Sequence, residues 1–337
     1  MKFVTARLLA MAISACAAVV AVPARAAPES SPATPKVIKM QSQGIPHAAF
    51  FGLSFEGSKG VAVGAGGAIY ESVDSGQTWK PVRHGLTELA LLAVDKRAGR
   101  TVAVGQFGLV MVEDGQGQWS KIDTDFKSRM YSVGLSPSGM AVAVGEFGTV
   151  LKSADSGKTW SSVAPDWSAL ADPDAPGTGE PSLFSVQVSD TDVITIAGEF
   201  GVMMRSTDAG STWQMLRPVK PKAPTIFAMH LVPQGQGSSF AVGQTGELLV
   251  SSDGGATWGR CTSQTSMNFL GVAASPSGQV VITGMRVMMR SLNGGMTWNP
   301  VVEGETTTDW YQAVRTVPGS GQIMAVGHAG QIIQIGG

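Results

Sequence analysis

Short runs of small apolar residues that end at a glycine recur along the whole chain. Examples are VAVG at 61–64 and AVAVG at 141–145. Runs of this length with alternating side chains are typical of short β-strands. The glycines that end the runs are Gly64, Gly105, Gly145, Gly198, Gly243, Gly284 and Gly327. Seven such runs predict a sevenfold internal repeat.

A second pattern, S-x-D-x-G-x-T-W, follows most of these glycines. Clear copies of this motif, here called the Asp box, end at Trp79, Trp160, Trp213, Trp258 and Trp298, and EDGQGQW ending at Trp119 is a degenerate copy. Successive tryptophans lie 40 to 53 residues apart. This period matches one four-stranded blade of a β-propeller.

A third set of larger residues opens a strand before each glycine: Phe51, Leu92, Tyr131, Phe184, Phe227, Leu270 and Tyr311. Together the three patterns predict an all-β fold, a single seven-bladed β-propeller whose blades each have four strands, a to d. In blade 3 we expect strands at 131–135, 141–144, 149–152 and 160–163. Blade 7 has only three, so we expect residues 37–40 to supply its fourth strand and close the ring.

The Asp boxes have a structural explanation that needs no catalysis. In the turn between strands c and d, Asp accepts backbone N–H bonds, Gly adopts a backbone conformation that other residues resist, and Trp packs between blades. We assign this role to Asp74, Asp155, Asp208 and Asp253. Asn293 replaces Asp in blade 6, which indicates that hydrogen bonding rather than charge is required.

The first 26 residues read as a secretory signal peptide. Lys2 and Arg7 precede a long apolar run, and a small-residue cleavage site ends at Ala26. An alternative is lipoprotein processing at Cys16, which follows Ile-Ser-Ala. We therefore expect a signal peptide at 1–26, a flexible leader at 27–36 and a propeller at 37–337, with a periplasmic or secreted location.

Composition narrows the classes of function. The chain of 337 residues has a formal net charge of −1, so it lacks the excess of basic residues that is typical of nucleic-acid-binding proteins. After removal of the signal peptide only Cys261 remains, which excludes an internal disulfide, and no further apolar stretch reaches the roughly 18 residues of a membrane span. The four histidines show no metal-ligand spacing. We expect a monomer without metal or cofactor.

Strand connectivity places candidate binding residues on the face opposite the Asp boxes. The b–c turns and the loops between blades lie there, and loops on a rigid scaffold commonly carry binding residues. Blades 2 to 4 share a Gln/Glu-Phe pair in this turn. Two interpretations remain open: the phenylalanines pack between blades, or the turns form an aromatic and acidic patch. The candidate partner-binding residues are Gln106, Phe107, Arg129, Glu146, Phe147, Trp167, Glu199, Phe200, Arg286, Trp310, Tyr311 and His328.

The longest insertion, at 164–182, joins blades 3 and 4 and carries Trp167. A loop of this length is either functional or disordered. An exposed tryptophan on such a loop would suit partner binding.

Asp boxes also occur in sialidases and other propeller glycosidases, so catalysis is the main alternative. The chain lacks an Arg-Ile-Pro motif, and Glu146 and Glu199 are the best candidates for the two carboxylates that a glycosidase needs. Both can be explained by repetition of one turn. A third possibility is a non-hydrolytic glycan-binding propeller in which Trp167, Trp310 and Tyr311 stack on sugars.

The A-V-G-x-x-G turn followed by the Asp box resembles the photosystem II stability and assembly factor propellers, over about residues 37–337. The resemblance implies a non-catalytic, chaperone-like protein that binds a membrane protein through a basic arginine patch. Here Arg129 and Arg286 stand beside Glu146 and Glu199. We therefore expect no enzymatic activity and a partner that is an envelope membrane protein or complex, either an exporter of the resistance-nodulation-division type or a photosystem subunit.

Overall fold

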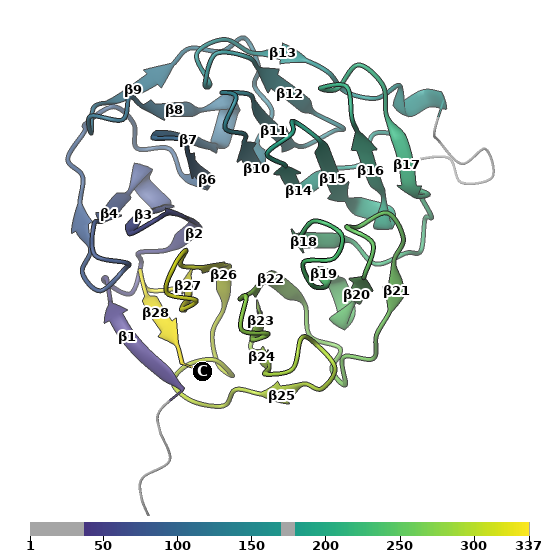
Figure 1. Cartoon of the computed structure of the whole chain (residues 1–337). Helices are drawn as coiled ribbons and strands as arrows, with labels where there is room; N and C mark the ends of the chain where they lie inside the picture. Colours follow the sequence, from purple (N-terminus) through teal and green to yellow (C-terminus); the bar gives the residue numbers. More distant parts are fainter. Residues whose placement is uncertain (1–36, 170–178, 337) are drawn as a thin grey trace, which may run out of the picture. The chain divides into compact units, whose positions relative to one another are not determined.

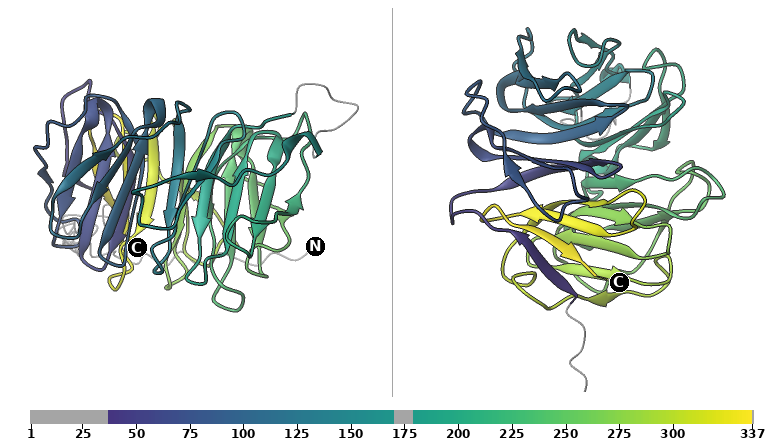
Figure 2. Two further views of the ribbon diagram at one scale, coloured as in Figure 1. Left: turned by 90° about the horizontal axis from the view of Figure 1, so that it is seen from above. Right: turned by 60° about the vertical axis from the view of Figure 1, so that its left-hand side comes forward.

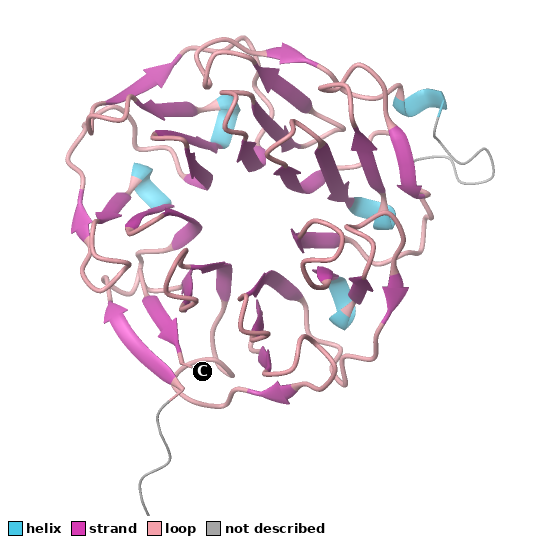
Figure 3. Ribbon diagram, viewed as in Figure 1, coloured by secondary structure: helices cyan, strands magenta, loops and turns pink. Residues whose placement is uncertain are grey.

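The computed structural model describes residues 37–169 and 179–336. In this part of the chain the strands form seven four-stranded antiparallel sheets, and helix is limited to short 3-10 turns (Figure 3). The sheets surround a central axis (Figure 1). The all-β, seven-bladed propeller is confirmed. The expected signal peptide and leader lie outside the described residues. Within the described residues, the structure contains no helix with the length and apolar character of a membrane span.

Each blade runs from an inner strand a at the axis to an outer strand d at the rim. The a strands are β2 (Phe50–Glu56), β6 (Leu91–Arg97), β10 (Met130–Leu135), β14 (Leu183–Val188), β18 (Ile226–His230), β22 (Phe269–Ala274) and β26 (Tyr311–Thr316). The b strands are β3 (Lys59–Gly64), β7 (Arg100–Gly105), β11 (Ala141–Gly145), β15 (Ile194–Gly198), β19 (Ser239–Gly243), β23 (Val280–Gly284) and β27 (Ile323–Gly327).

The two outer strands are shorter than the inner two in blades 1 to 6. The c strands are β4 (Ile69–Ser72), β8 (Val110–Glu113), β12 (Val150–Ser153), β16 (Met203–Ser206), β20 (Leu248–Ser251), β24 (Met288–Ser291) and β28 (Ile332–Ile335). The d strands are β5 (Lys80–Pro81), β9 (Trp119–Ile122), β13 (Ser161–Ser162), β17 (Gln214–Arg217), β21 (Gly259–Arg260), β25 (Asn299–Pro300) and, in blade 7, β1 (Ile38–Ser42).

The first strand of the chain closes the ring. β1 pairs antiparallel with β28, with Ile38 opposite Ile335, and Glu303 accepts the backbone N–H groups of Val37 and Ile38 at 2.7 and 3.1 Å. Strand β1 therefore occupies the free edge of blade 7 (Figure 1). The predicted closing strand is confirmed, shifted by one or two residues.

Both faces of each sheet are buried against neighbouring blades. The buried apolar residues fall into seven clusters, and each cluster joins two adjacent blades. In β7, Val102 and Val104 pack with blade 3, whereas Ala103 between them packs with blade 1. Strands buried on both faces read as continuous apolar runs, which explains the run of small apolar residues before each glycine.

The inner strands crowd together near the axis and require small side chains at one position. Each a strand carries a register shift after its first residue, for example between Phe50 and Gly52. The residue after the shift is always small: Gly52, Ala93, Ser132, Ser185, Ala228, Gly271 and Ala313. A Cβ on Gly52 would lie 2.9 Å from the backbone nitrogen of Val94 in the next blade, so even alanine is excluded there without a shift.

Hydrogen bonds link several neighbouring inner strands directly. Asp95 in blade 2 accepts the Ser54 hydroxyl of blade 1 at 2.9 Å and the Leu135 N–H of blade 3 at 2.8 Å. Ser132 and Ser185 likewise accept an N–H from the following blade, at 3.1 and 3.2 Å. These polar side chains hold successive blades in register at the axis.

The Asp boxes form the expected turns. In blade 1, Asp74 accepts the N–H of Thr78 at 2.9 Å and its hydroxyl at 2.6 Å. Gly210 of the blade 4 box has a φ of +90°, and a Cβ there would lie 2.9 Å from Cβ of Val163 in blade 3. In blade 6, Asn293 Nδ2 donates to the Thr297 hydroxyl. The aspartates are therefore part of the scaffold.

The degenerate box of blade 2 is built differently. Glu113 stands where other boxes have Ser; it accepts the N–H of Gly117 at 2.8 Å and forms a buried ion pair with Lys96 at 3.1 Å. Burial acts to raise the pKa of Glu113, but hydrogen bonds from Gly117, Thr101 and Lys96 outweigh it and lower that pKa. A buried charge pair thus replaces the usual hydroxyl.

One predicted register is wrong in blade 7. Tyr311 pairs with Gly327, as Phe50 pairs with Gly64, so Tyr311 is equivalent to Phe50 and not to Phe51. The residue equivalent to Phe51 is Gln312. Tyr311 is 1% exposed, which fits an interblade position.

Acid should destabilise the propeller in a defined pH range. Hydrogen bonds from Thr78 lower the pKa of Asp74 to about 2. Desolvation acts to raise the pKa of Asp155, but hydrogen bonds from Thr159 and Ser153 outweigh it and lower that pKa to about 2. The unfolded value is about 3.9. Ionisation therefore stabilises the fold above about pH 4, and this contribution is lost as the pH falls to about 2.

We expect the thermal unfolding midpoint to fall between about pH 4 and pH 2, and to fall less steeply in Asp155→Asn, because Asn does not titrate. Circular dichroism melts from pH 2 to 7 measure this. Equal slopes for the variant and the wild type would contradict it.

Candidate functional site

The two faces of the ring carry different connections. On one face the a–b turns contact the Asp boxes, as in the bond from Ser75 N–H to Ser58. On the other, here called the turn face, the b–c turns contact the loops that lead into each inner strand, as in the bond from Gln106 N–H to Ala90. Figure 2 shows the ring from the side. The turn face carries Gln106, Phe107, Glu146, Phe147, Glu199, Phe200, Arg286 and His328 in equivalent turns.

The Gln and Glu side chains of these turns act as clasps. Each accepts the backbone N–H of the residue just before the inner strand of its own blade: Ala90 N to Gln106 at 3.1 Å, Arg129 N to Glu146 at 3.1 Å, Ser182 N to Glu199 at 2.7 Å and Thr225 N to Gln244 at 3.4 Å. Either Gln or Glu serves at this position because the contact needs only an acceptor oxygen. The expected acidic patch is thus engaged in holding the turns.

Glu146 has two further partners. The Tyr131 hydroxyl donates to it at 3.2 Å, and Arg129 lies 3.6 Å away as an ion pair. Burial and the Glu146 charge raise the pKa of Tyr131, which therefore stays a neutral donor. Arg129 and Glu146 neutralise each other.

Phe107 and Phe147 are exposed, unlike Phe200 at the equivalent position of blade 4. They occupy the third position of their turns, are 67% and 71% exposed, and both have φ of 53°. The equivalent residue in blade 1 is Gly66. Phe200, with φ of 56°, is only half-exposed and packs against the cluster between blades 3 and 4. The open question is answered differently for the three: Phe200 packs, whereas Phe107 and Phe147 face solvent.

A groove with a mixed apolar and polar lining lies beside Phe147. It has a volume of about 450 Å³ and is lined by Phe126, Phe147, Pro165 and Trp167 among others. Phe126 reaches it from blade 2, where the backbone around Phe126 lies against Gly108. We call Phe107, Phe126 and Phe147 the blade 2–3 rim.

The expectation of an exposed Trp167 is wrong. Its side chain is 6% exposed, and its indole Nε1 donates to the carbonyl of Gly148 at 2.9 Å. It lies in the short turn η3 (Trp167–Ala169) and packs between blades 3 and 4. Trp167 thus forms the floor of the groove. Residues 170–178 of the insertion lie outside the described residues.

In blade 7 the structure gathers residues that the sequence spacing kept apart. His328 Nε2 lies 3.2 Å from Glu305 and Nδ1 lies 3.5 Å from Asp309. Among the described residues, these three form the one group of His, Cys, Asp and Glu with ligand atoms within 4.8 Å of one another. The two carboxylates lie beside opposite nitrogens of the imidazole, so they would stabilise a protonated His328.

The three aromatic residues proposed for sugar stacking do not form a platform. Tyr311 is buried, and its hydroxyl donates to Gln331 at 2.6 Å. Burial and the charges of Glu305 and Asp309 raise the pKa of Tyr311. Trp310 is half-buried and stacks on Phe51 at 5.8 Å. Trp167 is also buried, so these three side chains do not offer exposed rings on which a sugar could stack.

Sequence reasoning missed a cavity at the Asp-box end of the central channel. Its volume is about 480 Å³, and Asp95, Arg97, Gln187, Asp190 and Arg315 are among its lining residues. A signal was present in the sequence: the fifth residue of several inner strands is polar and follows a mainly apolar run, namely Ser54, Asp95, Gln187, His230 and Arg315.

The clasp predicts how Glu199 tolerates substitution. Glu199→Gln keeps the acceptor, as in Gln106 and Gln244, and should change the free energy of unfolding by less than about 0.5 kcal/mol. Glu199→Leu leaves the N–H of Ser182 without its partner and should cost about 1 to 2 kcal/mol. Urea unfolding measures both. An equal cost for the two variants would mean that the charge of Glu199 matters rather than its acceptor oxygen.

No known family model matches the chain. Curated relatives share part of its sequence. The photosystem II assembly lipoprotein Ycf48 of Trichormus variabilis is 26% identical over 186 residues, covering 54% of this chain and 51% of that protein. The photosystem II assembly protein Ycf48 of Thermosynechococcus vestitus is 25% identical over 186 residues, covering 54% and 50%. The chain thus matches about half the length of these relatives.

Solved structures share the fold at low sequence identity. Ycf48 bound to a D1 peptide superposes with a TM-score of 0.68 at 18% identity, covering 90% of this chain and 97% of that one. Ycf48 from Cyanidioschyzon merolae gives 0.69 at 17%, covering 89% and 98%. A GH74 xyloglucanase from Xanthomonas campestris gives 0.65 at 17%, covering 88% and 53%. The chain is a seven-bladed propeller similar to the Ycf48 photosystem II assembly factors.

Proposed function

We propose that this propeller is a non-catalytic binding factor that assists the assembly of an envelope membrane protein or complex. The observation that carries the proposal is the exposure of Phe107 and Phe147 on adjacent blades of the turn face. Phe126 adds a third ring, and the groove beside Phe147 adds both apolar and polar contacts. Exposed apolar patches of this kind mark interaction sites.

The backbone at these two phenylalanines strengthens the argument. A bulky residue in the left-handed region costs about 1 to 2 kcal/mol, and glycine, as at Gly66, avoids this cost. Exposing a phenyl ring to water gives no compensating stability. The left-handed φ itself belongs to the turn, because it recurs at Phe200, Thr245, Arg286 and Ala329. What supports contact with a partner at Phe107 and Phe147 is that a large apolar ring is exposed at such a position.

The carboxylates give little support to catalysis. Glu146 is occupied by Arg129 and Tyr131, and Glu199 by the N–H of Ser182. A glycosidase needs one carboxylic acid and one carboxylate free to act on the sugar. Glycan hydrolysis remains the alternative, because a GH74 xyloglucanase shares the fold.

The similarity to Ycf48 guides the proposed partner and location. One solved Ycf48 has a bound D1 peptide, which supports a photosystem subunit as the partner here. An exporter of the resistance-nodulation-division type is the alternative partner. We further propose export of this chain as a monomer to the periplasm or beyond. Two of the relatives are named lipoproteins, which favours the alternative processing at Cys16.

A double substitution tests the rim. Phe107→Gly with Phe147→Gly removes both rings and relieves the left-handed strain, so the variant should be at least as stable as the wild type. Capture from detergent-solubilised envelope should recover a membrane protein with the wild type and at least about tenfold less with the variant. Quantitative mass spectrometry measures the recovery.

Met296→Ala is the matched control, because Met296 is 80% exposed in an Asp box on the opposite face and blade 5 carries Ala256 at the equivalent position. Equal recovery by the rim variant and the wild type would refute the rim as the binding surface. Turnover of xyloglucan by the wild type that disappears in Glu146→Gln or Glu199→Gln would refute the non-catalytic role.

A further inference from the structure

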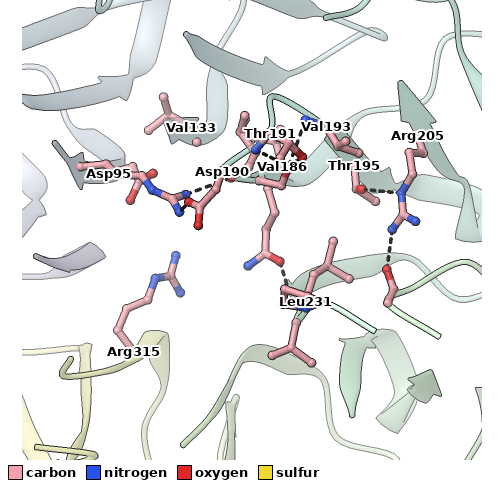
Figure 4. A pocket seen from close by; sticks show the side chains of 18 residues that line it. Asp95, Val133, Val186, Asp190, Thr191, Val193, Thr195, Arg205, Leu231 and Arg315 are labelled. Atoms are coloured by element: carbon pink, nitrogen blue, oxygen red, sulfur yellow. Dashed lines mark hydrogen bonds and ion pairs between the residues drawn. The ribbon is translucent and has the colours of Figure 1, made fainter. Parts of the chain in front are cut away.

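The cavity at the Asp-box end of the channel lies away from the turn face. Its walls come from five blades, mostly from the inner strands and the turns that follow them, through residues such as Asp95, Val133, Val186, Leu231 and Arg315 (Figure 4). A volume of about 480 Å³ falls in the range of small-molecule sites.

Three arginines and two aspartates line this cavity, so it carries an excess of positive charge. Two of the arginines are held by the protein. Arg97 pairs with Asp190 and donates to the carbonyls of Leu135 and Val188 at 3.2 and 3.1 Å. Arg205 donates to Thr195 and to the carbonyl of Gly254.

Arg315 is different. Its guanidinium donates from Nη1 to the carbonyl of Val314 at 2.9 Å, and within the described part of the chain no carboxylate oxygen lies within 4.0 Å of it. The side chain is surrounded by the channel walls and yet reaches the channel solvent. Burial lowers its pKa, but a guanidinium with solvent access stays charged at neutral pH. Several of its five N–H donors therefore have room for a ligand.

The carboxylate that interacts electrostatically with Arg315, that of Asp95, already accepts hydrogen bonds from other groups. Asp95 interacts with Arg315 electrostatically, but its carboxylate accepts the Ser54 hydroxyl and the N–H groups of Lys96 and Leu135. Burial and the charge of Arg315 lower the pKa of His230 to about 4, so His230 is neutral at pH 7. The charge of Arg315 thus faces the cavity without a direct counter-ion.

The remaining walls indicate what else a ligand should carry. Gln187 uses its carbonyl oxygen to accept the Leu231 N–H at 2.7 Å, which leaves its amide N–H donors available. Val133, Val186, Val188 and Leu231 supply apolar surface. An anionic head beside Arg315 and Gln187 and a short apolar body along these side chains would match both features.

We propose that this cavity binds a small organic carboxylate with a short aliphatic chain, and that Arg315 binds the carboxylate. Arginine suits this role because its planar fork can donate two parallel hydrogen bonds to a carboxylate. The site is independent of the blade 2–3 rim.

Isothermal titration with 4-methylpentanoate tests the proposal, with 4-methylpentanamide as the neutral analogue of the same shape. The carboxylate should bind at least about tenfold more tightly than the amide. Arg315→Gln should weaken binding of the carboxylate by at least about tenfold, and Arg315→Lys should give an intermediate loss because it keeps the charge without the fork. The matched control Arg83→Gln, an exposed arginine in a loop of the turn face, should bind as the wild type does.

Thermal melts establish that each variant is folded; if Arg315→Gln does not fold, Arg315→Lys and the amide comparison decide. The proposal is overturned if the wild type binds neither compound up to about 10 mM, if acid and amide bind equally, or if a folded Arg315→Gln retains wild-type affinity. Acetate that binds as tightly as 4-methylpentanoate would overturn the role of the apolar wall.

Discussion

Burial of each sheet between its two neighbours is the constraint on which the structure depends. Every apolar cluster joins two blades, so a blade alone would expose both faces to water. The ring must therefore close, and β1 closes it on β28. Near the axis the same packing leaves room only for Gly, Ala or Ser at the third residue of each inner strand, and polar side chains such as Asp95 join neighbouring strands there.

The residues that hold the ring together differ from those that we propose bind other molecules. The conspicuous polar residues, the Asp-box aspartates and the glutamates of the b–c turns, are engaged in turn hydrogen bonds. The residues without a structural role are less conspicuous in sequence: Phe107 and Phe147, which are exposed, and Arg315, which faces the channel. The two proposed binding surfaces thus lie on opposite sides of the ring, one formed by aromatic side chains and the other by a charged side chain.

The candidate site was only partly readable from the sequence. The turn repeat placed Gln106, Glu146 and Glu199 correctly on one face, because strand connectivity fixes the side on which each turn lies. Their role as clasps depends on backbone N–H groups some 16 to 19 residues away in the chain, and repetition alone does not reveal such contacts. Trp167 was misjudged because a loop tryptophan can turn inward once a carbonyl such as that of Gly148 accepts its indole N–H.

The sequence by itself determined the number of blades, the strands within them and the closing strand, because these follow from local periodicity and from the need to bury both faces of each sheet. Tertiary structure alone decided which side chains face solvent, the channel or a neighbouring blade. The equivalent residues Phe50 and Tyr311 lie one position before Phe51 and Gln312. Large residues occur at both the first and the second position of the inner strands, so the sequence pattern did not tell the two positions apart. His328, Glu305 and Asp309 meet only because two loops converge, and Arg315 faces a cavity only because seven inner strands surround one axis.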